Sequence, residues 1–147
     1  MIKVDVSCEP AKILKPNFTK IKNIIKIVYR NEKVYDYNIS IIFTNDELVN
    51  SLKRSFFKID ELTDVIAFRL NDYREKNVEG EIYISVERVF FNAKKYNEKK
   101  TNEISRTLIH GILHLLNYKD NTKESKDLMT LKENYYLKKV DCECFNV

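Results

Sequence analysis

Both histidines of the chain lie four residues apart in an otherwise almost wholly apolar run, RTLIHGILHLLNYKD, which spans Arg106 to Asp120. Successive helical residues turn by about 100°, so His110 and His114 would lie about 40° apart around a helix and about 6 Å apart along it. Two imidazoles on one face can bind the same metal ion. Zinc-binding helices of hydrolases use this spacing, so the run predicts a zincin-like metal helix.

A third ligand is expected at Asp120. A continuous helix would carry this carboxylate about 15 Å from His110 and off the shared face. Asn117 is expected to end the helix, because asparagine tolerates the left-handed conformation found at helix ends. The chain can then fold back and bring Asp120 to the two rings. Three protein ligands would hold one Zn²⁺ ion and leave a fourth position for water, which is the layout of a catalytic site. The alternative is that both histidines are core residues bonded to backbone carbonyls and that Asp120 only ends a loop.

The residue after the first histidine limits the chemistry. In HExxH peptidases this position is a glutamate that acts as general base. Here it is Gly111, so a peptidase lacks its proton acceptor, and another group or the metal-activated water must begin the reaction. A glycine also leaves a gap in the side-chain surface, where we expect a neighbouring strand or helix to approach closely.

The rest of the chain predicts one small domain over residues 1–147. There are only two glycines and two prolines and no low-complexity tract, so no linker divides it. Hydrophobic periodicity distinguishes the elements. Strands are expected at 2–6, 35–43, 63–68 and 81–85, and helices at 17–29, 44–57, 85–96, 101–116 and 123–137. Strict alternation is absent, which favours an α+β (α/β) fold with a small mixed β-sheet of about four strands backed by helices.

Some details of the helices follow from local patterns. Thr44 and Glu47 have the spacing of a capping box, and Ser85 and Thr101 are expected to cap the two helices that follow them. In the last segment, apolar residues recur at helical spacing and indicate the helix at 123–137. These residues are Leu128, Leu131, Tyr135 and Leu137.

The sequence also bears on where the protein is located and on the state of its cysteines. No apolar run approaches the roughly 18 to 20 residues of a membrane span, and residues 1–5 lack the layout of a signal peptide, so we expect a cytoplasmic protein without a membrane partner. The cysteine count is odd, which argues against a disulfide framework. Cys142 and Cys144, one residue apart near the end, are a weak metal or redox signal. We expect reduced thiols near a frayed terminus.

Basic residues concentrate in one segment. Residues 12–33 contain seven basic side chains and one acidic side chain, within a chain whose net charge is +4. Such a stripe along one helix can be a polyanion-binding face, and it can equally be a solvated face of a lysine-rich protein. If the stripe is a polyanion-binding face, the expected contact residues are Lys20, Lys22, Lys26 and Arg30.

Three segments together resemble one known family. The stretch 110–120, HGILHLLNYKD, is similar to the HGxLHLxGYDH signature of the YbeY family of metal-dependent endoribonucleases, which mature ribosomal RNA. TDVIAF at 63–68 resembles the family's TDVLSF strand, and GEIYIS at 80–85 resembles its GDIxIS strand. The motifs span most of the chain from about Leu52 to Leu137, and their combination is specific.

The sequence also departs from the family pattern. The third ligand is usually histidine, and here that position is Asp120, whose charge lowers the Lewis acidity of the ion and bears on metal preference. Asn117 stands where the motif has glycine. The family's Tyr-Arg pair before TDVLSF falls on Phe56 and Phe57. An arginine suited to a phosphate oxygen is therefore missing from this position.

The resemblance implies a zinc-dependent, single-strand-specific endoribonuclease that acts in ribosomal RNA processing, in 3′-end maturation of the small-subunit RNA and in ribosome quality control. Its partners would be ribosomal RNA and the small subunit, not DNA. RNA would lie near the polar connection at 69–79. The residue that moves the proton is not identified. The candidates are Asp64 and Glu81 by motif position, and Arg54 and Lys58 can replace the missing arginine.

Two other classes of function stay open. One is an assembly factor that binds RNA or the ribosome through the basic stripe and whose metal site is structural or inert. The other is a zinc peptidase or a hydrolase of another substrate, which Gly111 disfavours.

Overall fold

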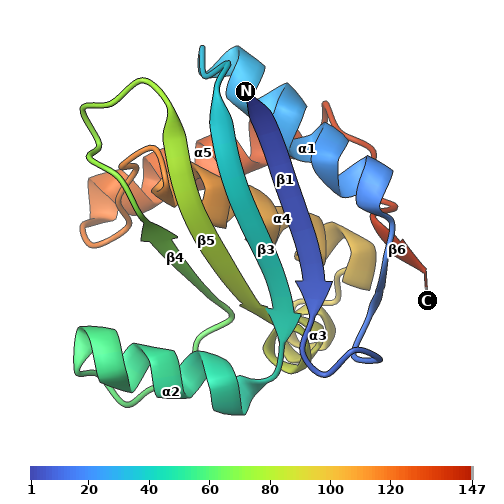
Figure 1. Ribbon diagram of the computed structural model, residues 1–147. Helices are drawn as coiled ribbons and strands as arrows, with labels where there is room; N and C mark the ends of the chain where they lie inside the picture. Colours follow the sequence, from blue (N-terminus) through green and yellow to red (C-terminus); the bar gives the residue numbers. More distant parts are fainter. Residues whose placement is uncertain (147) are drawn as a thin grey trace.

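The computed structural model describes residues 1–146. At its centre is a four-stranded sheet with the order β1-β3-β5-β4 (Figure 1). β1 (Ile2–Cys8), β3 (Tyr37–Thr44) and β5 (Val78–Ser85) are parallel, and β4 (Val65–Arg69) runs antiparallel to β5 at the edge. The mixed sheet of four strands and the α+β class are therefore confirmed.

The central strands form where β-branched and aromatic residues concentrate. β3 lies between two neighbours, and its last four residues are all buried. Ile41 pairs with Val6 on one side and with Ile82 on the other, so the sheet is apolar through its middle. A strand covered on both faces reads as a continuous apolar run rather than as an alternating one.

Three helices cover one face of this sheet (Figure 1): α1 (Phe18–Asn31), α4 (Lys100–His114) and α5 (Lys123–Leu137). α2 (Asp46–Phe57) lies against the other face, and α3 (Val86–Lys95) packs beside α4. Within residues 1–146, no helix combines the length and the apolar character that crossing a membrane requires.

α4 is the central helix of the covering layer and approaches the sheet closely. A Cβ atom added to Gly111 would lie 2.9 Å from Cγ2 of Ile82 and 3.4 Å from Cγ2 of Val65. The first distance is too short for a real contact, so only glycine allows this spacing between helix and sheet. The expected gap at Gly111 is confirmed, and it fixes the depth at which both histidines lie.

Two predicted helix caps are wrong and one is confirmed. The side chain of Asn45, not Thr44, caps α2 by accepting a hydrogen bond of 3.0 Å from the backbone N–H of Leu48. The Thr44 hydroxyl instead donates to the carbonyl of Glu9. Thr101 lies inside α4, which begins one residue earlier. Ser85 caps α3, as expected.

The helix predicted at 123–137 is confirmed as α5, but most of the apolar residues that indicated it are not buried. Of these apolar residues, Leu128, Leu131 and Tyr135 are exposed, and Leu137 is half-buried against the core. The residues that face the protein are Met129, Glu133 and Tyr136. This second set has the same helical spacing as the first, and periodicity alone favoured the more apolar one. Glu133 is buried because it has partners on α4, which the sequence of α5 does not reveal.

The segment 144–146 is packed rather than frayed, which corrects another expectation. β6 (Phe145–Asn146) pairs antiparallel with β2 (Lys15–Pro16). Cys144 is fully buried, with its sulfur 3.4 Å from the hydroxyl of Ser105. Burial raises the pKa of the Cys144 thiol to about 11. The three cysteines are free thiols, as expected, and Cys144 serves as a small core residue.

Candidate metal centre

The chain reverses direction directly after α4. Leu115 is the C-cap residue, and the N–H of Asn117 donates to the carbonyl of His114 at 2.9 Å. Asn117 has a φ of 72°, in the left-handed region. Asparagine tolerates this region better than most residues other than glycine. The predicted break at Asn117 is therefore confirmed, and it turns Asp120 back toward the helix.

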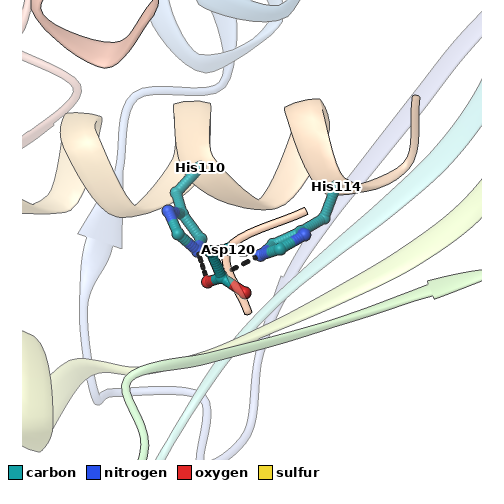
Figure 2. Close-up of side chains that lie close together, drawn as sticks. All are labelled: His110, His114 and Asp120. Atoms are coloured by element: carbon teal, nitrogen blue, oxygen red, sulfur yellow. Dashed lines mark hydrogen bonds and ion pairs between the residues drawn. The ribbon is translucent and has the colours of Figure 1, made fainter. Parts of the chain in front are cut away.

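Three potential ligand atoms converge where the turn meets the helix (Figure 2). Oδ2 of Asp120 lies 3.1 Å from Nε2 of His110 and 3.2 Å from Nε2 of His114. The two Nε2 atoms are 2.9 Å apart. The structure thus brings together the three side chains that the sequence selects.

The outer nitrogens of both rings have hydrogen-bond partners. Nδ1 of His110 lies 2.6 Å from Oε2 of Glu133, and Nδ1 of His114 lies 2.8 Å from the backbone carbonyl of Tyr118. Both partners are acceptors, so each Nδ1 carries the proton in the neutral ring and each Nε2 presents a lone pair. Metal-binding histidines have the same pattern of outer partners.

This donor set fits a divalent cation. Two nitrogen lone pairs and a carboxylate oxygen point at one another, which is repulsive unless a positive charge lies among them. Ligands at about 2.0 to 2.1 Å around a tetrahedral zinc ion are about 3.3 Å apart. The three separations here are 2.9, 3.1 and 3.2 Å, so small side-chain rotations suffice to admit an ion.

The pKa values of the three groups also indicate that a positive charge among them is favourable. Burial opposes the charged form of His110, but hydrogen bonds to Asp120 and Glu133 outweigh it and raise the pKa to about 9. Burial, followed by the charge of His110, lowers the pKa of His114. The hydrogen bond from His110 is the main cause that lowers the pKa of Asp120 to about 2. The cluster therefore favours a carboxylate together with one positive charge.

Glu133 is a residue of the site that the sequence did not reveal. It is 6% exposed and lies on α5, 23 positions after His110. Its other carboxylate oxygen forms an ion pair of 3.0 Å with Arg106. A carboxylate is almost never buried without partners. The available signal was its position four residues after Met129 and three before Tyr136, in the stripe that is buried.

A second carboxylate, that of the half-buried Glu32, anchors the turn that carries Asp120. It accepts hydrogen bonds from the hydroxyls of Tyr118 and Tyr136, and Nζ of Lys132 lies 3.0 Å away. Burial alone would raise the pKa of Glu32, but these donors lower it. Since the carbonyl of Tyr118 also accepts from His114, the Glu32 cluster and the ligand set share one residue.

A cavity of about 760 Å³ opens beside the three potential ligand residues. Its lining includes the two histidines and Asp120. Other parts of the wall come from α2, from β4 and from the connections around them. They include Lys53, Phe57, Asp64, Ala67, Tyr73 and Lys119. The ligand set is therefore accessible to a molecule much larger than water.

The catalytic candidates from the sequence fall in different places. Asp64 lines the cavity, and burial raises its pKa although the nearby charge of His110 opposes this. Glu81 is the neighbour of Ile82, which faces α4, so its side chain points to the opposite face of the sheet. Arg54 forms an exposed ion pair with Asp60 at 3.6 Å, and Lys58 is exposed at the end of α2. Within residues 1–146, the cavity lining includes Asp64 but not Glu81, Arg54 or Lys58.

The basic residues of α1 lie away from this cavity. Lys20, Lys22 and Lys26 line a separate hollow of about 400 Å³ together with Val4 of β1. β1 and β4 are at opposite edges of the sheet (Figure 1), and the two hollows share no lining residue among those described. Lys20 is also paired with Asp141 at 3.1 Å.

Comparisons with known proteins agree with this geometry. The family model described as Endoribonuclease YbeY matches residues 6–141. Relatives named Endoribonuclease YbeY include one from Chloroherpeton thalassium, 38% identical over 80% of this chain and 82% of its own length. Another, from Amoebophilus asiaticus, is 38% identical over 83% of this chain and 82% of its own. A solution structure of a Thermotoga maritima protein superposes with a TM-score of 0.61 at 26% identity, covering 94% of this chain and 87% of that one.

The family match covers β3, β4 and β5, the helix α4 and the turn that carries Asp120. The resemblance found in the three motifs is thus confirmed over nearly the whole chain. His110, His114 and Asp120 form a group that could hold a metal ion. The chain belongs to the YbeY family of endoribonucleases.

Proposed function

We propose that this protein is a zinc-dependent, single-strand-specific endoribonuclease that processes ribosomal RNA in the cytoplasm, including the 3′ end of the small-subunit RNA, and takes part in ribosome quality control. The observation that carries the proposal is the convergence of His110, His114 and Asp120 beside a cavity large enough for a nucleotide. Family membership supports an RNA phosphodiester as the bond that is cleaved.

In the proposed mechanism, His110, His114 and Asp120 hold the metal ion. Zinc, when bound there, supplies Lewis acidity and lowers the pKa of a water molecule toward about 7. Glu133 and the carbonyl of Tyr118 keep each Nδ1 protonated, so that both Nε2 atoms stay available as ligands. These contacts hold the ligands in position before the substrate binds, which lowers the reorganisation needed for reaction.

Asp64 is the residue that we propose moves a proton. It lines the cavity, and burial raises its pKa, which makes its carboxylate a stronger proton acceptor. Glu81 is less suitable, because its side chain lies on the other face of the sheet. Lys53 and Lys119 line the cavity and are suited to contact phosphate oxygens in place of Arg54 and Lys58.

The basic residues of α1 would act outside the cavity. In this proposal Lys20, Lys22, Lys26 and Arg30 attract the phosphates of a larger RNA at a distance from the cleavage point. The separation of this stripe from the cavity favours one second candidate function, an assembly factor that binds RNA or the small subunit without cutting it. A peptidase is not favoured, since Gly111 stands where the general base would be.

Metal analysis and RNA cleavage by the wild-type protein, His114→Ala and Asp64→Asn test the proposal. We expect about one zinc ion per wild-type chain, cleavage of a single-stranded RNA but not of a duplex of the same length, and loss of both metal and cleavage in His114→Ala. Asp64→Asn should keep the metal and lose most of the activity, because general acid–base groups contribute typically 10²- to 10⁴-fold.

Undiminished cleavage by His114→Ala would overturn the catalytic assignment. RNA binding without any cleavage by the metal-loaded wild-type protein would favour the assembly factor instead.

A further inference from the structure

Two exposed aromatic side chains line the cavity beside the ligand set. Phe57, at the end of α2, is 48% exposed, and Tyr73, in the connection between β4 and β5, is 50% exposed. Single apolar residues on a surface need no explanation, but aromatic rings gathered at one cavity are typical of a ligand-binding surface. Phe57 and Tyr73 line the same cavity as His110 and His114, so the ligand expected to contact them is the substrate strand.

Phe57 is supported on one face of its ring. It stacks on Phe68 of β4 with ring centroids 5.9 Å apart and planes at 18°. Phe68 in turn packs edge-on against Tyr83 of β5, with centroids 6.0 Å apart. The ring of Phe57 is thus held by the sheet, while about half of the residue is open to solvent. A flat apolar face that is already fixed loses little conformational freedom when a ligand stacks on it.

Tyr73 has a support of a different kind. The guanidinium carbon of Arg69 lies 5.1 Å from the centre of its ring. Arg69 is itself fixed by donating to the carbonyl of Leu115 at 2.7 Å and to those of Asp72 and Asn77 at 3.0 Å each. Leu115 directly follows His114. Arg69 therefore connects the ring of Tyr73 to the end of α4.

We propose that Phe57 and Tyr73 each stack on an unpaired base of the bound strand, and so select nucleotides that have left a helical stack. This assignment rests on the proposed function, because it takes RNA as the ligand. An aromatic face accepts any base. Lys53 and Lys119 in the same lining can meet the phosphates between them. Aromatic rings together with lysine side chains in one cavity match the bases and phosphates of a nucleic-acid strand better than they match an apolar peptide.

Binding of a short fluorescent RNA to the chelator-treated protein separates this idea from catalysis. Each base of the RNA is removed in turn to leave an abasic sugar, and affinity is measured by fluorescence anisotropy. We expect the wild-type protein to lose roughly tenfold in affinity at two positions of the RNA. Phe57→Leu should abolish the loss at one of them and Tyr73→Ala at the other. Phe57→Trp and Tyr73→Phe should keep both losses.

Phe91→Leu is the matched control. Phe91 is 57% exposed on α3 with the guanidinium of Arg88 4.8 Å from its ring centre, and it does not line the cavity among the described residues. Phe57→Leu keeps apolar packing on Phe68, so a change in discrimination reports the flat ring rather than misfolding. Circular dichroism of each variant checks the fold.

Equal affinity for intact and abasic RNAs, no measurable RNA binding, or an abasic profile that Phe57→Leu and Tyr73→Ala leave unchanged would each overturn the inference. Cleavage that depends on His114 together with any of these results would leave the proposed function standing and remove only the stacking assignment. Base-dependent binding that requires both rings, without any cleavage, would support the stacking assignment and contradict the proposed function.

Discussion

Oε2 of Glu133 lies 2.6 Å from Nδ1 of His110, so a side chain of α5 orients a potential metal ligand on α4. The second carboxylate oxygen binds Arg106, one helical turn before His110. Glu133 therefore has both oxygens engaged, and its position is set by two contacts on the metal helix. Outer partners of this kind fix the tautomer and the direction of the ligating nitrogen.

We expect Glu133→Leu to lower metal affinity by roughly 10- to 100-fold, because Nδ1 of His110 then loses its acceptor. Glu133→Gln should lose less, since its amide oxygen can still accept the hydrogen bond. Titration against a chelator of known affinity gives the values. Arg106→Gln is the matched control, because it removes the ion pair but keeps the bond to His110, and it should stay close to wild type. Full affinity in Glu133→Leu would show that Glu133 is only structural.

The Glu32 cluster predicts a specific dependence of stability on pH. The pKa of Glu32 is lowered in the folded protein, so the folded state favours the carboxylate. The resulting stabilisation is fully present above the ordinary glutamate value of about 4.3 and is lost as pH falls through the lowered pKa. Glu32 has a side chain only 9% exposed, so solvent screens these bonds little.

Glu32→Gln should therefore lower the free energy of unfolding by about 2 kcal/mol at pH 7, a typical value for hydrogen bonds to a charged group. The difference from wild type should shrink as pH falls below 4, because the wild-type carboxylate then takes up its proton. Urea denaturation at several pH values measures both effects. A difference that stays constant down to the lowest pH would mean that the charge of Glu32 contributes nothing.

Gly111→Ala should destabilise the protein although alanine favours helix by about 1 kcal/mol over glycine. The added methyl would meet Cγ2 of Ile82 at 2.9 Å, and overpacking of this kind costs typically 1 to 3 kcal/mol. Because α4 must move away from the sheet, metal affinity should fall as well. Thermal unfolding and chelator titration test this, and Gly111→Ser should be at least as harmful. A more stable Gly111→Ala protein would mean that the side chains of the sheet accommodate the added methyl group at little cost.

Replacement of Lys20, Lys22 and Lys26 by glutamate should weaken binding of a long RNA and flatten its salt dependence. Loss of three phosphate contacts reduces the slope of log affinity against log salt by roughly 2. Metal affinity should not change, since the stripe is separate from the metal cavity. Glutamates at the exposed Lys94, Lys95 and Lys99 provide a control of equal charge. The same slope in both triple variants would make the stripe an ordinary solvated face.

The amino-acid sequence by itself determined the elements that depend on neighbours along the chain. The histidine helix follows from a four-residue spacing in an apolar run, and its end follows from the left-handed tolerance of Asn117. Because ligand set and turn lie within eleven residues, local geometry was enough to bring Asp120 back to the rings.

Only the tertiary structure decided which other residues support that site. Glu133 comes from 23 positions after His110, and Glu32 from 86 positions before Tyr118. Two stripes of α5 have the same periodicity, and the sequence favoured the one that is exposed. The physical reason is that the free energy of burying a carboxylate depends on partners from other elements, and periodicity along one helix carries no information about them.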